Sequence, residues 1–519
     1  MKELQNIKPR KYQEEIAKTC IEKNCLVVLP TGLGKTLIAL MVVIERIKKF
    51  PKEKVLILAP TKPLAEQHLI SFKEKLPELW AEIELFTGTV KAEKRKKIWD
   101  TANIIFSTPQ CVANDLKKGL YTLKEVSLLI EDEAHRCVKN YDYTYVAKRY
   151  YLEANHPRLI GLTASPGSDL QKIREIGMNL KIESIEIRTR DSDDVKEYLQ
   201  ELEFDKREIP FPEELIELRA ILKQIYESYI DELRRRNFLF GPDTKIALIE
   251  LQRKIGFQLS KNIASPESYI AMSACAQAIK ISHAIELLET QTLESFMKYL
   301  RSIQEQAEKK QSRGVIKLAN KKEFNLVYSY TYSLLEKGKE HPKVEEIIRA
   351  VRDEIKEDSE MKMIIFTQFR DTANIISRNL NKLGGINSKV FVGQRKLEGV
   401  GLSQKEQKKI IDEFREKKIN VLVATCIAEE GLDIPEVSSV IFYEPVSSAI
   451  RSIQRRGRTA RLSKGKLIML ITKGTKDEFA NYASRAREKK MGTQIEKVKD
   501  ELKRKGTLYD KKIIQKKLF

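Results

Sequence analysis

Short, continuous apolar runs recur along the first part of the chain, between residues 1 and 205. Strands that are buried on both faces of a parallel sheet have this pattern. Each run is followed by enough residues for a crossover helix that returns the chain to the same edge of the sheet. This part therefore predicts an α/β domain with a parallel sheet. The five runs are LVVL (26–29), VLILA (55–59), IIFS (104–107), LLIED (128–132) and LIGLT (159–163).

The same pattern returns between residues 343 and 482, which predicts a second α/β domain of the same kind. Between two of its apolar runs, residues 403–418 have the signals of a helix, with Ser403 as the N-cap and Glu406 completing a capping box. The runs are MIIFT (363–367), KVFVG (389–393), VLVAT (421–425), VIFYE (440–444) and LIMLI (467–471).

The segment 206–342 between these domains has a different period. Apolar residues recur there at steps of three and four, which indicates helices, and Gly241-Pro242 predicts a stop. Residues 266–310 continue the helical pattern. The fold class we expect is thus two parallel-sheet α/β domains with an all-helical insert between them, followed by a tail at 483–519. The first periodic positions are Leu215, Leu218, Leu222, Ile225 and Tyr229.

The charge balance favours a polyanionic partner. Lys and Arg number 95 against 74 Asp and Glu, a net charge of +21 over 519 residues. The insert contributes only +3 over residues 211–340, whereas residues 481–519 contribute +8. That basic end is either a solvated helix or a contact with nucleic acid or a further domain. No membrane span or signal peptide is visible, so we expect an intracellular protein and no membrane partner.

The segment PTGLGKT (30–36) directly follows an apolar run and precedes a helical one. Glycines let the backbone N–H groups of such a loop turn inward onto phosphates, at the positive end of the helix. Lys35 would reach the β- and γ-phosphates, and Thr36 would bind Mg²⁺ through its hydroxyl. Leu29 stands where the strict phosphate-loop pattern has a glycine. The residues predicted to hold ATP here are Thr31, Gly32, Leu33, Gly34, Lys35 and Thr36.

A second motif, Asp132-Glu133-Ala134-His135, ends another apolar run. An aspartate at this place can hold Mg²⁺, and the adjacent glutamate can orient and deprotonate an attacking water. Asp132 and Glu133 are therefore predicted catalytic residues. For His135 two interpretations stay open, a hydrogen bond between domains and a role in sensing ATP.

A third motif, QRRGRTAR (454–461), places four arginines within seven residues of the second α/β domain. Guanidinium groups suit phosphate, and from this domain they reach a γ-phosphate only if the two domains close over it. We predict catalytic roles for Gln454, Arg458 and Arg461. The alternative is a basic helix on the surface.

These motifs, in this order, resemble those of superfamily 2 DExH helicases, whose two motor domains are RecA-like. The resemblance covers about residues 1–200 and 345–480. It implies that Arg10 and Gln13 read adenine, that Gly431 and Asp433 face the nucleotide, and that residues 163–165 couple hydrolysis to domain motion. It also implies backbone contacts with nucleic acid, which carry no base sequence, at Pro60, Thr61, Lys62, Gly88, Thr108, Pro109, Gln110, Thr367, Gln368 and Thr425.

The combination of LPTGLGKT, TASP, GLDIP and QRRGRTAR with a helical insert is similar to the helicase portion of the archaeal Hef family, of the XPF/FANCM type. In that family the insert resembles a polymerase thumb and grips branched duplex. The resemblance implies an ATP- and Mg²⁺-dependent helicase or translocase that acts on forks and Holliday-type junctions in repair and fork restart, moving 3′ to 5′. Full-length Hef also has a nuclease with an ERKxxxD signature, which this sequence lacks. We therefore expect either the helicase portion of a longer protein, which the basic end KKIIQKKLF favours, or a motor that stands alone.

Other functions remain open at this point. The insert is shared by the RIG-I-like receptors and the Dicer helicase, so a double-stranded RNA translocase is an alternative. An ATP-switched clamp that grips nucleic acid without unwinding it needs the same residues. A metabolic P-loop ATPase would explain neither the second motor half nor the charge.

Overall fold

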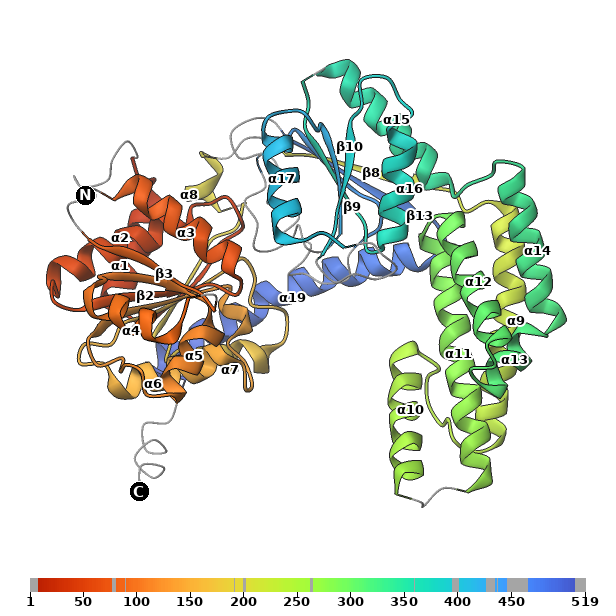
Figure 1. Cartoon of the computed structure of the whole chain (residues 1–519), viewed down its shortest axis with the longest axis horizontal. Helices are drawn as coiled ribbons and strands as arrows, with labels where there is room; N and C mark the ends of the chain where they lie inside the picture. The colour runs from red at the N-terminus through yellow and green to blue at the C-terminus, as the bar shows by residue number, and fades with distance from the viewer. Residues whose placement is uncertain are drawn as a thin grey trace.

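The computed structural model describes residues 8–76, 81–88, 90–190, 192–198, 202–261, 265–358, 360–393, 401–425, 435, 437–445 and 465–508. Two α/β domains and a helical bundle lie in a row, and one long helix, α19, runs along them toward the first domain (Figure 1). Among the described residues, no helix is both long and apolar enough to cross a membrane.

The first domain contains a seven-stranded parallel sheet in the order β3-β4-β2-β5-β6-β1-β7. All five expected runs lie in its strands. The two strands that the apolar pattern missed, β3 and β7, are the edge strands, and their side chains are only partly buried, so neither reads as a continuous apolar run. The strands are β1 (Cys25–Val28), β2 (Lys54–Leu58), β3 (Ile83–Phe86), β4 (Ile104–Ser107), β5 (Val126–Asp132), β6 (Leu159–Thr163) and β7 (Ser184–Ile187).

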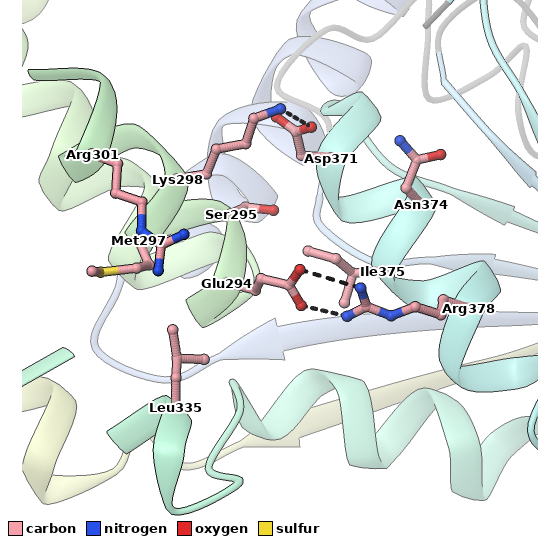
Figure 2. Close-up of a pocket in the computed structure, with 10 residues that line it drawn as sticks. All are labelled: Glu294, Ser295, Met297, Lys298, Arg301, Leu335, Asp371, Asn374, Ile375 and Arg378. Carbon is pink, nitrogen blue, oxygen red and sulfur yellow. Dashed lines mark hydrogen bonds and ion pairs between the residues drawn. The ribbon is translucent and has the colours of Figure 1, made fainter. Parts of the chain in front are cut away.

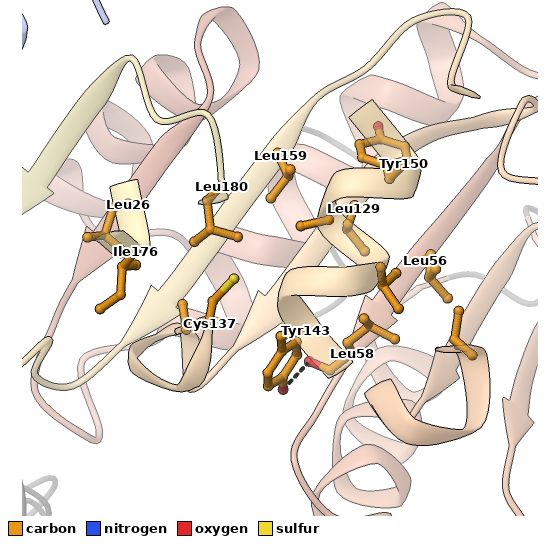
Figure 3. Close-up of a cluster of buried hydrophobic side chains, with 14 of the residues drawn as sticks. Leu26, Leu56, Leu58, Leu129, Cys137, Tyr143, Tyr150, Leu159, Ile176 and Leu180 are labelled. Carbon is orange, nitrogen blue, oxygen red and sulfur yellow. Dashed lines mark hydrogen bonds between the residues drawn. The ribbon is translucent and has the colours of Figure 1, made fainter. Parts of the chain in front are cut away.

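Helices cover both faces of this sheet, and each face has its own apolar core. Figure 3 shows part of one core, in which Tyr143 and Tyr150 of α6 lie over leucines of the central strands. The helices are α1 (Lys11–Glu22), α2 (Lys35–Lys49), α3 (Lys62–Lys75), α4 (Ala92–Thr101), α5 (Pro109–Lys117), the 3₁₀ turn η1 (Ala134–Arg136), α6 (Asp142–Glu153), α7 (Leu170–Asn179) and α8 (Asp193–Lys196).

The second domain contains a six-stranded sheet in the order β10-β11-β9-β12-β13-β8. Strand β8 (Leu202–Ile209) precedes the insert in the chain but pairs with β13 of the second domain. The expected boundary at residue 205 is therefore wrong: the chain joins the second sheet before it enters the insert. The other strands are β9 (Met363–Phe366), β10 (Ser388–Phe391), β11 (Val421–Ala424), β12 (Ser439–Phe442) and β13 (Gly465–Thr472), and the helices are α15 (Pro342–Glu357), α16 (Arg370–Leu380) and α17 (Gln404–Arg415).

The helix expected at 403–418 is α17, and its capping box between Ser403 and Glu406 forms as predicted. The regular elements of the insert between residues 213 and 336 are all helices, and all five periodic positions of the first helix are buried. Its helices are α9 (Glu213–Arg235), α10 (Lys245–Ser260), α11 (Pro266–Thr290), α12 (Leu293–Glu308), α13 (Arg313–Ala319) and α14 (Lys322–Glu336).

The basic C-terminal segment is largely one helix, α19 (Lys476–Lys505), which begins before the expected tail boundary. One face of this helix carries Met491, Ile495, Val498 and Leu502 into the core of the first domain. The helix is therefore not simply solvated: it starts directly after the sheet of the second domain and ends against the first.

Candidate ATP site

The phosphate loop, the Asp132 motif and residues 163–165 lie close together because the strands that precede them are neighbours. Strand β1 lies next to β6, which lies next to β5, and the register pairs Val28 with Thr163 and Asp132 with Leu162. The carboxyl ends of parallel strands lie at one edge of a sheet, where α/β proteins bind their ligands. The phosphate loop, the Asp132 motif and residues 163–165 thus open onto the same edge.

The phosphate loop has the backbone that its glycines predict. Gly32 and Gly34 have φ values of 89° and 83°, in the left-handed region that glycine adopts readily. Gly34 is also the N-cap of α2. A side chain at Gly34 would collide with the amide of Gln13. Lys35 Nζ donates a 2.8 Å hydrogen bond to the carbonyl of Leu29, a contact for which bound phosphate would compete.

The segment predicted to read adenine is tied directly to the phosphate loop. Gln13 Nε2 donates to the Leu33 carbonyl at 3.1 Å, and Tyr12 Oη donates to the same oxygen at 2.9 Å. Gln13 Oε1 in turn accepts from the backbone N–H of Arg10 at 2.9 Å. The sequence motif did not single out Tyr12, although it is completely buried. Its position at the start of α1, next to Gln13, is the signal that could have found it.

Asp132 and Glu133 lie where β5 ends. Asp132 Oδ2 is 2.8 Å from His68 Nε2 of α3. Burial opposes ionisation of Asp132, but the hydrogen bond from His68 and the charges of His68 and Lys35 outweigh it and lower its pKa. Glu133 has a φ of 52°, which is rare for a residue with a side chain and common at functional sites.

His135 faces its own domain in the contacts that the structure gives. Its Nδ1 lies 3.2 Å from Thr163 Oγ1 and 3.3 Å from Glu133 Oε2. Thr163 Oγ1 also accepts from the backbone N–H of Ser165 at 3.1 Å. A chain of polar contacts therefore joins the Asp132 motif to residues 163–165. Ser165 Oγ then lies 2.9 Å from Met491 Sδ of α19.

The donor set at this edge is of the kind that holds Mg²⁺ together with a nucleotide. Mg²⁺ is usually held by one or two protein oxygens and by substrate phosphates and water, not by an all-protein cage. Asp132 supplies a carboxylate that its surroundings keep ionised, and Thr36 follows Lys35 in the first turn of α2. Among the described residues, no cluster of three or more acidic, histidine or cysteine side chains could hold a metal by itself.

The residues expected to contact nucleic acid lie at helix starts and strand ends. Thr61 and Thr108 are the N-caps of α3 and α5, which follow the neighbouring strands β2 and β4. Helix N-termini present free N–H groups that suit phosphates. The related positions are Pro60 and Lys62 beside Thr61, Gly88 after β3, Pro109 and Gln110 beside Thr108, Thr367 and Gln368 after β9, and Thr425 after β11.

Within this set, Gln110 Nε2 donates to Tyr141 Oη at 3.2 Å. Thr367 is completely buried, and its hydroxyl has no hydrogen-bond partner among the described residues. Thr425 donates its backbone N–H to the Phe391 carbonyl at 3.1 Å. The remaining predicted site residues lie outside the described part of the chain: Gly431, Asp433, Gln454, Arg458 and Arg461.

Three family models match the chain in the order of the domains. The DEAD/DEAH box helicase model matches residues 10–173, and the helicase conserved C-terminal domain matches 342–463. A helical-bundle model of ATP-dependent RNA helicases matches residues 214–333.

Curated relatives extend beyond this chain. It is 37% identical over 487 residues to MJ1505 of Methanocaldococcus jannaschii, whose name describes a candidate ATP-dependent RNA helicase, and covers 60% of that protein. It is 30% identical over 482 residues to the ATP-dependent DNA helicase fml1 of Schizosaccharomyces pombe and covers 58% of it. These alignments include 93% and 91% of this chain. The chain thus spans about three-fifths of the length of these relatives.

Among solved structures, the crystal structure of the Pyrococcus furiosus Hef helicase domain matches with a TM-score of 0.70 at 41% sequence identity. The match covers 92% of this chain and 98% of that one. It includes both parallel-sheet domains and the helical bundle between them. The chain belongs to the superfamily 2 helicases, in the Hef-type branch.

Proposed function

We propose that this chain is an ATP-dependent helicase or translocase that acts on branched DNA, including forks and Holliday-type junctions, in repair and fork restart, and that it moves 3′ to 5′. The observation that carries the proposal is a set of polar contacts at one sheet edge, alongside 41% identity to the Hef helicase domain. Gln13 contacts the Leu33 carbonyl, His68 contacts Asp132, and His135 contacts Thr163. A P-loop enzyme of metabolism has no need for the second sheet and insert that accompany it.

Each residue has a task in hydrolysis. Lys35 exchanges the Leu29 carbonyl for the β- and γ-phosphates, and Thr36 and Asp132 would hold Mg²⁺, which neutralises charge on the phosphate oxygens. Glu133 orients a water and accepts its proton. The water oxygen then bonds to the γ-phosphorus while the bond to the bridging oxygen breaks, leaving ADP and phosphate. Arg458 and Arg461 of the second domain complete the site when the domains close.

Hydrolysis must change the grip on the strand if the protein is to move. The polar contacts from Glu133 through His135 to Thr163 are the described route from the γ-phosphate side of the site to residues 163–165. The helix starts at Thr61 and Thr108 lie at the same edge of the first sheet. Alternating grip by the two domains on the sugar–phosphate backbone would advance the protein without reading bases.

The test compares ATPase rates with forked DNA and with double-stranded RNA at equal nucleotide concentration. We expect strong stimulation by the fork and little by the RNA. Glu133→Gln should keep ATP binding and lose about 10²–10⁴-fold in turnover, since a general base contributes about that much. Glu45→Gln is the matched control, because Glu45 lies in an exposed pair with Lys48. Unchanged turnover in Glu133→Gln would remove the catalytic assignment.

Double-stranded RNA is the second candidate substrate. It is favoured by the RNA-helicase helical-bundle match at residues 214–333 and by the name of the M. jannaschii relative. Stimulation by RNA alone would change the substrate and leave the ATP site as described. Stimulation by the fork without any displaced strand in a helicase assay would favour the ATP-switched clamp.

A further inference from the structure

The side chain of His68 makes a contact that the helicase motifs do not account for. Its Nε2 lies 2.8 Å from Oδ2 of Asp132, and the side chains are only 12% and 8% exposed. The contact joins α3 to the end of β5, across 64 positions of sequence. We propose that His68 is a positioning residue that orients the Asp132 carboxylate for Mg²⁺ in the nucleotide site.

The surroundings of His68 hold it firmly in place. Leu64, His68 and Phe72 follow one another at intervals of four on α3, so they share one face of the helix. Leu64 and Phe72 are buried core residues, and the Phe72 ring meets Phe106 of β4 edge-on with centroids 5.1 Å apart. His68 therefore lies between two core anchors that hold this part of α3 in place, and its own side chain is largely buried.

Asp132 is held from a second direction. Tyr143 Oη donates a 2.7 Å hydrogen bond to the backbone carbonyl of Asp132, and the tyrosine is completely buried in α6. The backbone of Asp132 is thus fixed by α6 and its carboxylate by α3. With Oδ2 accepting from His68, the carboxylate has a fixed partner on the side of α3. Partners of this kind around a metal ligand set its orientation and its readiness to bind.

The proposal rests on the proposed ATPase function and adds a requirement for one side chain, His68. An N–H donor at position 68 is needed to orient the carboxylate. A filler of similar size without a donor should fail, and a different side chain with a donor should succeed.

The experiment measures Mn²⁺ binding to the ADP-bound full chain by electron paramagnetic resonance, with no turnover involved. His68→Leu keeps the bulk and removes the donor, whereas His68→Gln keeps an N–H donor of similar reach. We expect His68→Leu to weaken Mn²⁺ binding at least about tenfold, the lower end of what such partners contribute. His68→Gln should stay within about threefold of the unaltered chain. Steady-state ATPase should show the same order in the Mg²⁺ concentration needed for half-maximal rate.

Two controls separate positioning from folding. His156→Leu removes a comparable contact, the 2.6 Å pair with Glu53, at an exposed place away from the site. This variant should leave Mn²⁺ affinity and the Mg²⁺ dependence of the ATPase unchanged. In an Asp132→Asn background, His68→Leu should cause no further loss, because the carboxylate that it orients is gone.

The outcomes are distinct. Equal Mn²⁺ affinity in the unaltered, Leu and Gln chains would overturn the proposal. Equal loss in Leu and Gln, with a lower melting temperature in both, would make His68 a packing residue only, which also overturns it. Failure of the unaltered chain to bind nucleotide and Mn²⁺ together would instead remove the proposed ATPase function itself.

Discussion

Two contacts between parts of this molecule differ sharply in chemistry. The C-terminal helix α19 meets the first domain through Met491, Ile495, Val498 and Leu502, which join that domain's apolar core. The insert meets the second domain mostly through polar groups, although Phe369 of the second domain also packs against the insert's apolar core. Apolar burial is not directional and grows with the area removed from water, whereas polar contacts depend on exact partners. The apolar contact of α19 therefore mainly adds stability, whereas the polar contact of the insert mainly fixes one relative arrangement of the insert and the second domain.

The contact between the insert and the second domain has a buried centre and a solvent-exposed rim. At its centre, Lys343 of α15 pairs with Asp477 of α19 and donates to the Thr290 carbonyl of α11 at 3.1 Å, and Lys343 and Asp477 are almost fully buried. Thr372 Oγ1 likewise donates to Gln291 at 2.8 Å.

Figure 2 shows the rim, where a cavity of about 460 Å³ separates α12 from α16. Two ion pairs cross it, Glu294 with Arg378 and Lys298 with Asp371. Buried and exposed polar contacts thus both connect the insert to the second domain. We expect the insert and the second domain to move together if the two α/β domains close.

The largest effect should come from the buried ion pair. Lys343→Ala should cost about 3–5 kcal/mol in the free energy of unfolding of the second domain, since it leaves Asp477 buried without its partner. Lys343→Met with Asp477→Leu should recover most of that loss, because two apolar side chains of similar volume need no partner. Hydrogen exchange in α15 measures both. A cost below about 1 kcal/mol for Lys343→Ala alone would mean that water reaches the Asp477 carboxylate at the centre of this contact.

The apolar contact should be the next most sensitive. Leu502→Ala should cost about 2–5 kcal/mol, the usual range for a buried leucine, and exchange protection in the second half of α19 should fall by that amount. Lys503→Ala, on the exposed side of the same turn, is the control. Protection that falls equally in both would show that α19 is held by helix propensity and not by the core.

Inside the insert, Glu286 gives an acid-dependent contact. Its hydrogen bond with His283 and its 2.7 Å pair with Lys245 of α10 lower its pKa to about 2 from 4.5, against the effect of burial. A carboxyl group whose pKa is lower in the folded than in the unfolded chain stabilises the fold at pH values above its unfolded pKa. This stabilisation is lost as the pH falls through the pKa of the folded state. We expect α10 to lose about 1–2 kcal/mol of protection between pH 4.5 and 2, after allowing for partial solvent exposure. Glu286→Gln should flatten this window, whereas Glu250→Gln should leave it unchanged.

The smallest effect belongs to the rim. Arg378→Ala should change stability by no more than about 1 kcal/mol, because exposed ion pairs contribute little and are screened by salt. Thermal unfolding at low and high salt measures it, with Arg415→Ala as a second exposed pair for comparison. A larger loss would show that the rim also carries the attachment of the insert.

The sequence alone predicted most of the fold and much of the candidate site. Ten apolar runs became strands, and nine of them are central strands, which are buried on both faces of a parallel sheet and need continuous apolar residues. The tenth, β10, lies at the edge of the second sheet. The phosphate loop and the Asp132 motif were visible because their chemistry depends on neighbours in sequence. The edge strands β3 and β7 escaped the pattern because their side chains are only partly buried.

Only the tertiary structure decided the contacts between distant segments. Nothing in the local pattern shows that β8 would cross to the second sheet, that α19 would return to the first domain, or that His68 would meet Asp132 across 64 positions. Short-range periodicity records which face of an element is buried. It does not record against which element that face packs, because many apolar or polar partners would satisfy the same pattern and only the folded chain selects one.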